Sequence, residues 1–135
     1  TANVDAGMYR ELTKTAYLFK GKFYYQYKNG TTKLFKKANI GSVVFRGIPN
    51  DIDACFVHDD GKAYFFKGDK YYRFDFGQNK MDQQGTIASN RWGGIPKNIE
   101  AAFYKNGKAY FYKMGIEYTY DSATKKLTTR EAIKL

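Results

Sequence analysis

The sequence predicts an all-β fold of the β-propeller type, with three antiparallel blades of three to four strands each. One observation is a motif that recurs three times with a fixed period. The acidic residues at its start are Asp5, Asp53 and Glu100, so the spacings are 48 and 47 residues. A second is that each copy contains short runs of Tyr, Phe and Val bounded by turn residues, which is typical of strands. We therefore expect one domain over residues 1–135, with repeat units at about 4–51, 52–98 and 99–135.

The first strand of each unit is distinguished by a small centre. These strands are expected at residues 4–8, 52–56 and 99–103. Their central pairs are Ala6-Gly7, Ala54-Cys55 and Ala101-Ala102. The innermost strands of a propeller crowd around one axis, where only small side chains fit. The three segments are therefore predicted to lie side by side near that axis.

The second strand is apolar at consecutive positions, as in Ala63 to Phe66. A half-exposed strand alternates, whereas a strand covered on both faces need not, and neighbouring blades cover the middle strands of a propeller blade. The dipeptides Asp60-Gly61 and Asn106-Gly107 precede second strands. They favour tight hairpins, because glycine adopts positive φ at little cost.

The remaining elements carry weaker signals. Third strands are expected at residues 23–27, 71–76 and 117–121. Fourth strands are expected near Thr32 to Phe35, Lys80 to Asp82 and Lys125 to Thr128. Short helical turns are expected near Gly85 to Ser89 and Thr129 to Ile133.

Composition and charge narrow the function classes. The net charge is +10, which attracts polyanions such as acidic glycans, nucleic acid or anionic lipid without choosing among them. No apolar run approaches the length of a membrane span, so no membrane association is predicted. Cys55 is the only cysteine, so no intramolecular disulfide can form, and we expect it to be a buried structural thiol.

The repeats resemble the hemopexin-like repeat family. The resemblance rests on Ile52 to Phe56, Lys62 to Asp75, and Trp92 to Pro96, and the middle unit matches best. It implies four blades, whereas this chain holds three, and it favours a secreted protein. The lack of disulfide-capable cysteines instead favours an intracellular one, so the compartment stays open.

The resemblance also implies an axial ion. Backbone carbonyls at Asp5, Asp53 and Glu100 are expected to hold Ca²⁺ or Na⁺ in the channel, with a chloride bound further along it. From the residues themselves, the side chains could equally take local hydrogen bonds or salt bridges. Haem is not expected, because His58 is the only histidine.

Catalysis is not predicted. His58 is expected in a solvated turn before Asp59 and Asp60, whose side chains should point apart rather than form an acid–base pair. One histidine and one cysteine do not predict a nucleophile–base constellation. Basic residues alternate with aromatic residues that should pack between blades, so nucleic acid is not the expected partner. Lys33, Lys36 and Lys37 form the densest basic cluster and the best candidate for contact with a polyanion.

The sequence therefore predicts a non-enzymatic binding module that recognises a protein, a matrix component or a glycan. Two alternatives remain: a storage-type protein that binds a small ligand or ion, and a basic lectin-like or defence protein that binds polyanions. Trp92 is expected to anchor the junction between the second and third units. Three blades leave two faces uncovered, so we expect a second copy, a partner chain with the missing blade, or an upstream segment to cover aromatic residues there. These residues are Tyr17, Phe19, Tyr25, Tyr110 and Tyr112.

Overall fold

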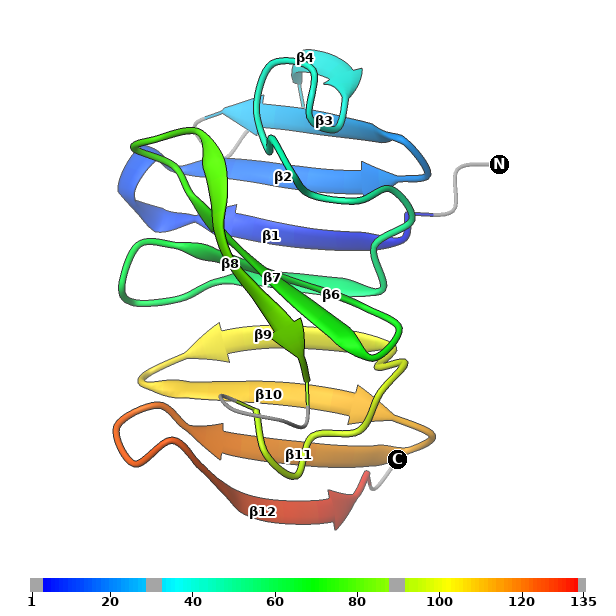
Figure 1. Cartoon of the computed structure of the whole chain (residues 1–135), viewed down its shortest axis with the longest axis vertical. Helices are drawn as coiled ribbons and strands as arrows, with labels where there is room; N and C mark the ends of the chain where they lie inside the picture. The colour runs from blue at the N-terminus through cyan, green and yellow to red at the C-terminus, as the bar shows by residue number, and fades with distance from the viewer. Residues whose placement is uncertain (1–3, 29–32, 88–91, 134–135) are drawn as a thin grey trace.

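The structure, a computed structural model, describes residues 4–28, 33–87 and 92–133 and contains three four-stranded antiparallel sheets (Figure 1). Blade A contains β1 (Ala6–Arg10), β2 (Thr15–Lys20), β3 (Phe23–Lys28) and β4 (Leu34–Asn39). Blade B contains β5 (Ala54–Val57), β6 (Ala63–Lys67), β7 (Lys70–Asp75) and β8 (Lys80–Thr86). Blade C contains β9 (Ala101–Lys105), β10 (Lys108–Lys113), β11 (Ile116–Asp121) and β12 (Lys126–Ala132).

The three sheets are arranged radially. In every blade the strands lie in chain order, from an innermost first strand to an outermost fourth. Strand β5 packs against both β1 and β9, so the three first strands surround a common axis as predicted. Blades A and C lie on opposite sides of blade B (Figure 1). The ring is not closed, because no fourth sheet connects blade C to blade A within the described residues.

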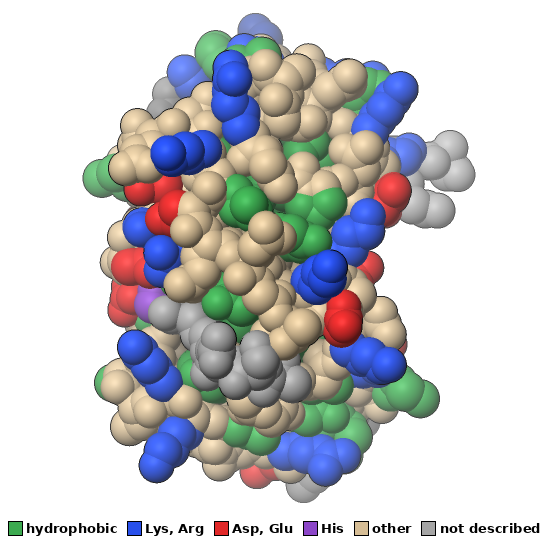
Figure 2. Space-filling view, viewed as in Figure 1, with side chains coloured by type: hydrophobic (Ala, Val, Ile, Leu, Met, Phe, Trp, Pro, Cys, Tyr) green, Lys and Arg blue, Asp and Glu red, His purple; other side chains and the backbone are tan. Residues whose placement is uncertain are grey.

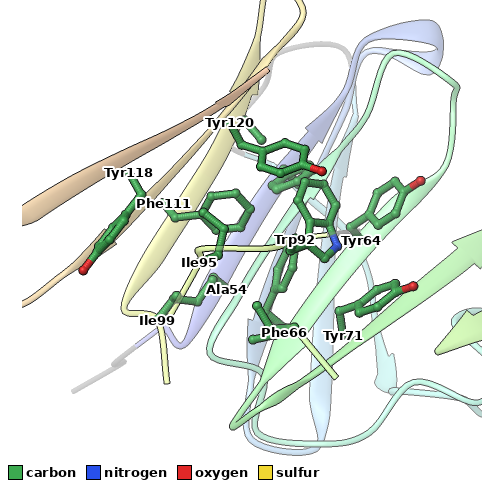
Figure 3. Close-up of a cluster of buried hydrophobic side chains, with 13 residues drawn as sticks. Ala54, Tyr64, Phe66, Tyr71, Trp92, Ile95, Ile99, Phe111, Tyr118 and Tyr120 are labelled. Carbon is green, nitrogen blue, oxygen red and sulfur yellow. The ribbon is translucent and has the colours of Figure 1, made fainter. Parts of the chain in front are cut away.

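Each blade junction has its own aromatic core. Between blades A and B, Phe45 is fully buried, and its ring centroid lies 5.3 Å from that of Phe19 and 5.6 Å from that of Phe65. Between blades B and C, Trp92 takes the equivalent place against Phe66 and Tyr120, with centroid distances of 5.6 and 4.9 Å (Figure 3). Each linker between units thus inserts one large ring between two sheets, and most of these contacts are edge-to-face.

In each linker, a glycine lies two residues after the buried aromatic ring and lets the linker approach the outermost strand of the following blade. Gly47 has φ +89°, and a Cβ there would lie 2.9 Å from the Cβ of Met81 in β8. Gly94 has φ +91°, and a Cβ there would lie 3.0 Å from Leu127 in β12. Both positions combine a left-handed backbone with a close contact, so side chains are disfavoured for two separate reasons.

Several sequence-based boundaries need correction. The first strands begin two residues later than predicted, because Asp5, Asp53 and Glu100 bind the neighbouring hairpin turn and precede the ladder. The outermost strands are longer than predicted. Helical turns were predicted at 85–89 and 129–133, but β8 extends to Thr86 and β12 to Ala132. Both predictions were wrong where the residues are described, because pairing with the third strand extends these edges. Positions 88 and 89, like Thr32 at the expected start of β4, lie outside the described residues.

Among the described residues, the only helix is the three-residue 3-10 turn Glu11–Thr13. None of the described helical structure has the length or apolar character needed to cross a membrane.

Candidate functional site

The axial channel has an acidic opening at one end. The carboxylate of Asp5 accepts a hydrogen bond from the backbone N–H of Gly21 at 2.7 Å, and that of Asp53 accepts one from Gly68 at 2.8 Å. Glu100 accepts a longer one from Met114 at 3.3 Å. The repeated acidic residue therefore has one structural role in all three blades, which is to fix the hairpin between the second and third strands.

The same acidic residues lie around one cavity. Asp5, Asp53 and Glu100, together with Asp51, line an opening of about 470 Å³. It continues into a narrower space of about 90 Å³ between the small residues of the three first strands. Among the described residues, no three His, Cys, Asp or Glu side chains gather as a metal-binding group.

The opposite end of the channel contains a polar cluster centred on His58. The prediction of a solvated turn was wrong for this residue, because His58 is only 7% exposed. Its ring lies against Tyr104 of blade C, with centroids 4.4 Å apart, and 5.4 Å from Tyr64. Radial packing brings the turn of blade B against blade C, and this contact covers the imidazole. In Figure 2 the chain's single histidine lies at the left edge beside acidic side chains.

Hydrogen bonds connect this imidazole to both blades. Its Nε2 atom lies 2.6 Å from the Oγ atom of Ser122 in the β11–β12 turn. Its Nδ1 atom lies 2.7 Å from Asp59 Oδ1 and accepts a 3.2 Å hydrogen bond from the backbone N–H of Asp60. One nitrogen cannot donate to Asp59 and accept from Asp60 at the same time. The Ser122 hydroxyl can donate or accept, so it fits either tautomer.

Both adjacent carboxylates approach the Nδ1 atom of His58, at 2.7 Å for Asp59 and 3.5 Å for Asp60, so they do not point apart as predicted. Asp59 is 62% exposed. Asp60 also accepts hydrogen bonds from the Tyr64 hydroxyl at 3.0 Å and from the backbone N–H of Lys62 at 2.9 Å. Asp60 therefore stabilises the turn, whereas Asp59 keeps an oxygen available to solvent or to a ligand.

Tyr104 adds a buried hydroxyl to the cluster. Its oxygen is inaccessible, and no hydrogen-bond partner is found for it among the described residues. Burial, assisted by the carboxylates of Asp59 and Asp60, raises the pKa of Tyr104, so the phenol stays neutral. The side chains of Ser122 and Asp59 are the polar groups that act on this hydroxyl, so Tyr104 is part of the wall of the cluster.

Two cavities meet at this cluster. One of about 360 Å³ lies at the channel end, and one of about 420 Å³ lies between the turns of blades B and C. His58, Asp59 and Asn106 line both. We call the site formed by five residues the His58 pocket: His58, Asp59, Tyr104, Asn106 and Ser122.

The side chains of Ser122, His58 and Asp59 lie at hydrogen-bonding distances from one another, in the order that a nucleophile, a base and an acid have in hydrolases. The surroundings favour binding over acyl transfer. The backbone N–H of Ser122 donates to Gly107 at 3.1 Å, and that of Ala123 donates to Asp121 at 2.9 Å. These two donors are thus not available to stabilise an oxyanion.

The other predicted site residues are dispersed. Lys36 and Lys37 pair with Gln26 and Tyr25, so the pleat directs them to opposite faces of blade A. The Nζ atom of Lys37 lies 4.6 Å from the ring centroid of Phe23, and Lys33 is exposed just before β4. Lys33, Lys36 and Lys37 thus do not form one patch on a single face.

The two predicted structural residues lie in the interior. Cys55 is 1% exposed in β5, and burial raises the pKa of its thiol. Trp92 is fully buried at the junction of blades B and C.

Sequence reasoning missed the His58 pocket because its residues come from three separate turns and, for Tyr104, from strand β9. His58 and Asp59 precede β6, Asn106 precedes β10, and Ser122 follows β11. The available signal was positional, since turns at the same point in successive repeats gather at the same end of a propeller. Nothing in the local sequence indicated that Ser122 and His58 make contact.

Comparisons with known proteins identify the repeat and the fold. The hemopexin family model matches residues 52–97. No curated protein gives a significant match. Several solved structures of plant proteins are similar in fold.

A plant lectin from Cicer arietinum with two metal binding sites is 24% identical with a TM-score of 0.72, over 87% of this chain and 60% of that chain. An albumin from Cicer arietinum that shows hemagglutination is 21% identical with a TM-score of 0.79, over 96% and 66%. A hemopexin fold protein from cow pea is 21% identical with a TM-score of 0.73, over 97% and 68%.

This chain thus spans 60% and 66% of the two Cicer arietinum proteins. At these identities the likeness concerns the fold. The direct match at 52–97, the two further copies of the same motif and the radial sheets agree with one another. The middle unit of the chain therefore matches the hemopexin repeat, and the chain has the hemopexin fold.

Proposed function

We propose that this chain is a non-enzymatic, lectin-like binding module that holds a sugar in the His58 pocket. The observation that carries the proposal is the convergence there of a carboxylate, an amide and a hydroxyl beside aromatic rings. A pocket with a few convergent polar groups among apolar walls is the usual form of a small-ligand site.

The chemistry of the pocket suits a sugar. A sugar ring has an apolar C–H face that packs on aromatic rings, and Tyr104 and Phe103 both line the cavity. Its hydroxyls need acceptors and donors, which the exposed oxygens of Asp59 and the amide of Asn106 supply.

The structural neighbours support the same class of function. One is named a lectin, and another is an albumin that shows hemagglutination, an activity that requires binding to a cell surface. Both share the fold of this chain, and the sugar-binding role is carried over only as part of this proposal.

The test is glycan-array binding followed by titration of the best glycan. Asp59→Ala removes an exposed carboxylate from the pocket and should weaken binding by about tenfold, the usual effect of losing a charged hydrogen bond. Asp69→Ala is the matched control, because Asp69 is also exposed on blade B but lies in the β6–β7 turn. If Asp59→Ala leaves the dissociation constant unchanged, the glycan does not bind in this pocket. If no glycan on the array binds, the lectin function is excluded.

We also propose an axial Ca²⁺ or Na⁺ held by backbone carbonyls at Asp5, Asp53 and Glu100, with a chloride further along the channel. The acidic opening supports it, since four carboxylates favour cation entry. One neighbour is named for two metal binding sites. Calcium should raise the melting temperature and a chelator should reverse that effect. A melting temperature unchanged in calcium, sodium and chelator would contradict the axial ion.

The main alternative is polyanion binding. The net charge of +10 favours it, and Lys33, Lys36 and Lys37 are its candidate contacts. Retention on heparin that collapses with salt, together with no sugar binding, would favour this alternative.

A further inference from the structure

Blades A and C each have one face that no other blade covers. Met8, Tyr17 and Phe19 of blade A are buried in the core shared with blade B, and so are Ala109 and Phe111 of blade C. Side chains alternate along a strand, so the intervening residues lie on the opposite face. We call these faces the open face of blade A and the open face of blade C.

The prediction that five aromatic residues lie on uncovered faces is therefore correct for three of them and wrong for two. Tyr17 is 6% exposed and Phe19 is fully buried, because their side of the pleat faces blade B. Tyr25, Tyr110 and Tyr112 do lie on the open faces and are partly exposed. On blade A, Tyr25 faces Leu18 across the ladder. On blade C, Tyr110 stacks on Phe103 with centroids 4.7 Å apart.

The open face of blade A is basic. Lys20 pairs with Phe23, and Lys37 pairs with Tyr25, so the two lysines share this face with the rings. The Nζ atom of Lys37 lies 4.6 and 5.5 Å from the centroids of Phe23 and Tyr25. Within residues 4–28, 33–87 and 92–133, neither lysine forms an ion pair with a carboxylate.

The open face of blade C has an acidic pair. Glu117 of β11 lies directly opposite Glu131 of β12, an arrangement that repels. Glu117 accepts a 2.6 Å hydrogen bond from the Tyr112 hydroxyl, and no cation balances either glutamate in the described part of the chain. Tyr112 and the two glutamates line a cavity of about 420 Å³ that contains no lysine or arginine.

Both open faces lie on the same side of the molecule. Blades A and C flank blade B on opposite sides (Figure 1), so their uncovered faces both look away from it. Along the channel direction, Lys20 and Glu117 lie towards the same, acidic end, because Lys20 precedes the β2–β3 turn and Glu117 follows the β10–β11 turn. Towards the acidic end of the channel, the chain thus presents two lysines on the open face of blade A beside two glutamates on that of blade C. Lys105 and Lys108 share the open face of blade C but lie at its other end.

We propose that a second copy of this chain docks on these two faces around a two-fold axis parallel to the channel. A rotation of that kind places blade A of each copy on blade C of the other. Lys20 and Lys37 of one copy then meet Glu117 and Glu131 of its partner, and the contact occurs twice. A two-fold interface requires one self-complementary surface, and the paired open faces have that property.

The physical reasons for docking are apolar area and charge. Aromatic side chains such as Phe103, which is 44% exposed, leave contact with water in the interface. The repulsion between Glu117 and Glu131 is relieved when lysines approach. The alternative two-fold axis, which places blade A on blade A, brings lysines together and is disfavoured.

The test is sedimentation equilibrium of five samples at micromolar concentration: the unmodified chain, two charge-reversal variants, their mixture and a control variant. The unmodified chain should have twice the 15.6 kDa monomer mass and should dissociate as salt is raised. In a dimer of Lys37→Glu, the new carboxylate faces Glu131 of the other copy in both contacts. In a dimer of Glu131→Lys, the new ammonium faces Lys37 of the other copy in both contacts. Each variant alone should raise the dissociation constant at least about tenfold. An equimolar mixture of the two variants should form heterodimers, because both contacts are then attractive.

Lys80→Glu is the matched control, with the same charge change at an exposed position on β8 of blade B. It should leave the dissociation constant within about twofold of that of the unmodified chain. Each chain keeps its substitution in the mixture, so a variant that failed to fold would not dimerise there. Dimers in the mixture would therefore show that each variant alone loses dimerisation through charge repulsion and not through misfolding. Three outcomes would each overturn the proposal. They are an unmodified chain that is monomeric, a dimer whose dissociation constant is unchanged by both charge reversals, and assemblies that keep growing with concentration.

Discussion

The Nε2 atom of His58 in blade B lies 2.6 Å from the Oγ atom of Ser122 in blade C, although 64 residues separate them in the chain. Behind this contact the imidazole packs at a tilt against Tyr104, which also belongs to blade C. The two contacts join the turns of neighbouring blades at the channel end opposite the acidic opening. They fix the walls of the His58 pocket.

We expect His58 and Ser122 to be energetically coupled. His58→Ala and Ser122→Ala should each lower the free energy of unfolding, the first by more because it also loses ring contacts. A double-mutant cycle in urea should give a coupling energy of about 1 kcal/mol, typical of one buried hydrogen bond. Additive losses would show that the 2.6 Å contact does not contribute to stability.

Trp92 should be among the most sensitive positions in the chain. Its ring is fully buried between blades B and C, against Phe66, Phe111 and Tyr120 (Figure 3). Trp92→Ala should lower the free energy of unfolding by about 3–5 kcal/mol, measured by urea denaturation. Phe35→Ala, at a ring that is 57% exposed, is the control and should cost at most about 0.5 kcal/mol. Equal losses for the two would contradict the anchoring role.

The Cys55 thiol should react only when the protein unfolds. It is 1% exposed, and burial raises the pKa of the thiol, so little reactive thiolate forms. A thiol reagent should label the native chain at the rate of global opening and the denatured chain at once. Cys55→Ala combined with Ala101→Cys provides an exposed thiol as a positive control. Rapid labelling of native Cys55 would show that the channel admits the reagent.

Tyr112 should make stability fall at alkaline pH. Burial, followed by the hydrogen bond to Glu117, raises the pKa of Tyr112 to about 12 from its ordinary value of 10.0. Above pH 10 the unfolded chain loses this proton more readily than the folded chain. Tyr112 therefore makes its full contribution to the free energy of unfolding below pH 10, and this contribution is lost as the pH rises towards 12. In thermal melts, Tyr112→Phe should show a shallower decline across this window, and an identical decline would contradict the assignment.

The repeat period determined the number of blades and the order of their strands. Asp5, Asp53 and Glu100 marked the three units, and the small residues of the first strands indicated a shared axis. Such signals are local, because each blade pairs strands that follow one another in the chain. The linker residue Trp92 could be recognised for a related reason, since it occurs at a fixed point between repeats. Strand ends were less predictable, since pairing with a neighbour extended β12 through Thr129 against the prediction.

The tertiary structure decided everything that depends on faces and on contacts between blades. Lys36 and Lys37 are adjacent in sequence, but the pleat separates them. Tyr17 and Tyr25 look alike in sequence, yet blade B covers only the first. The local pattern of the sequence was enough to predict three repeat units with a common strand order. Only packing of those units around an axis could bring His58 to Ser122 or place two uncovered faces on one side, because contacts between distant segments depend on how whole sheets pack and not on any local pattern.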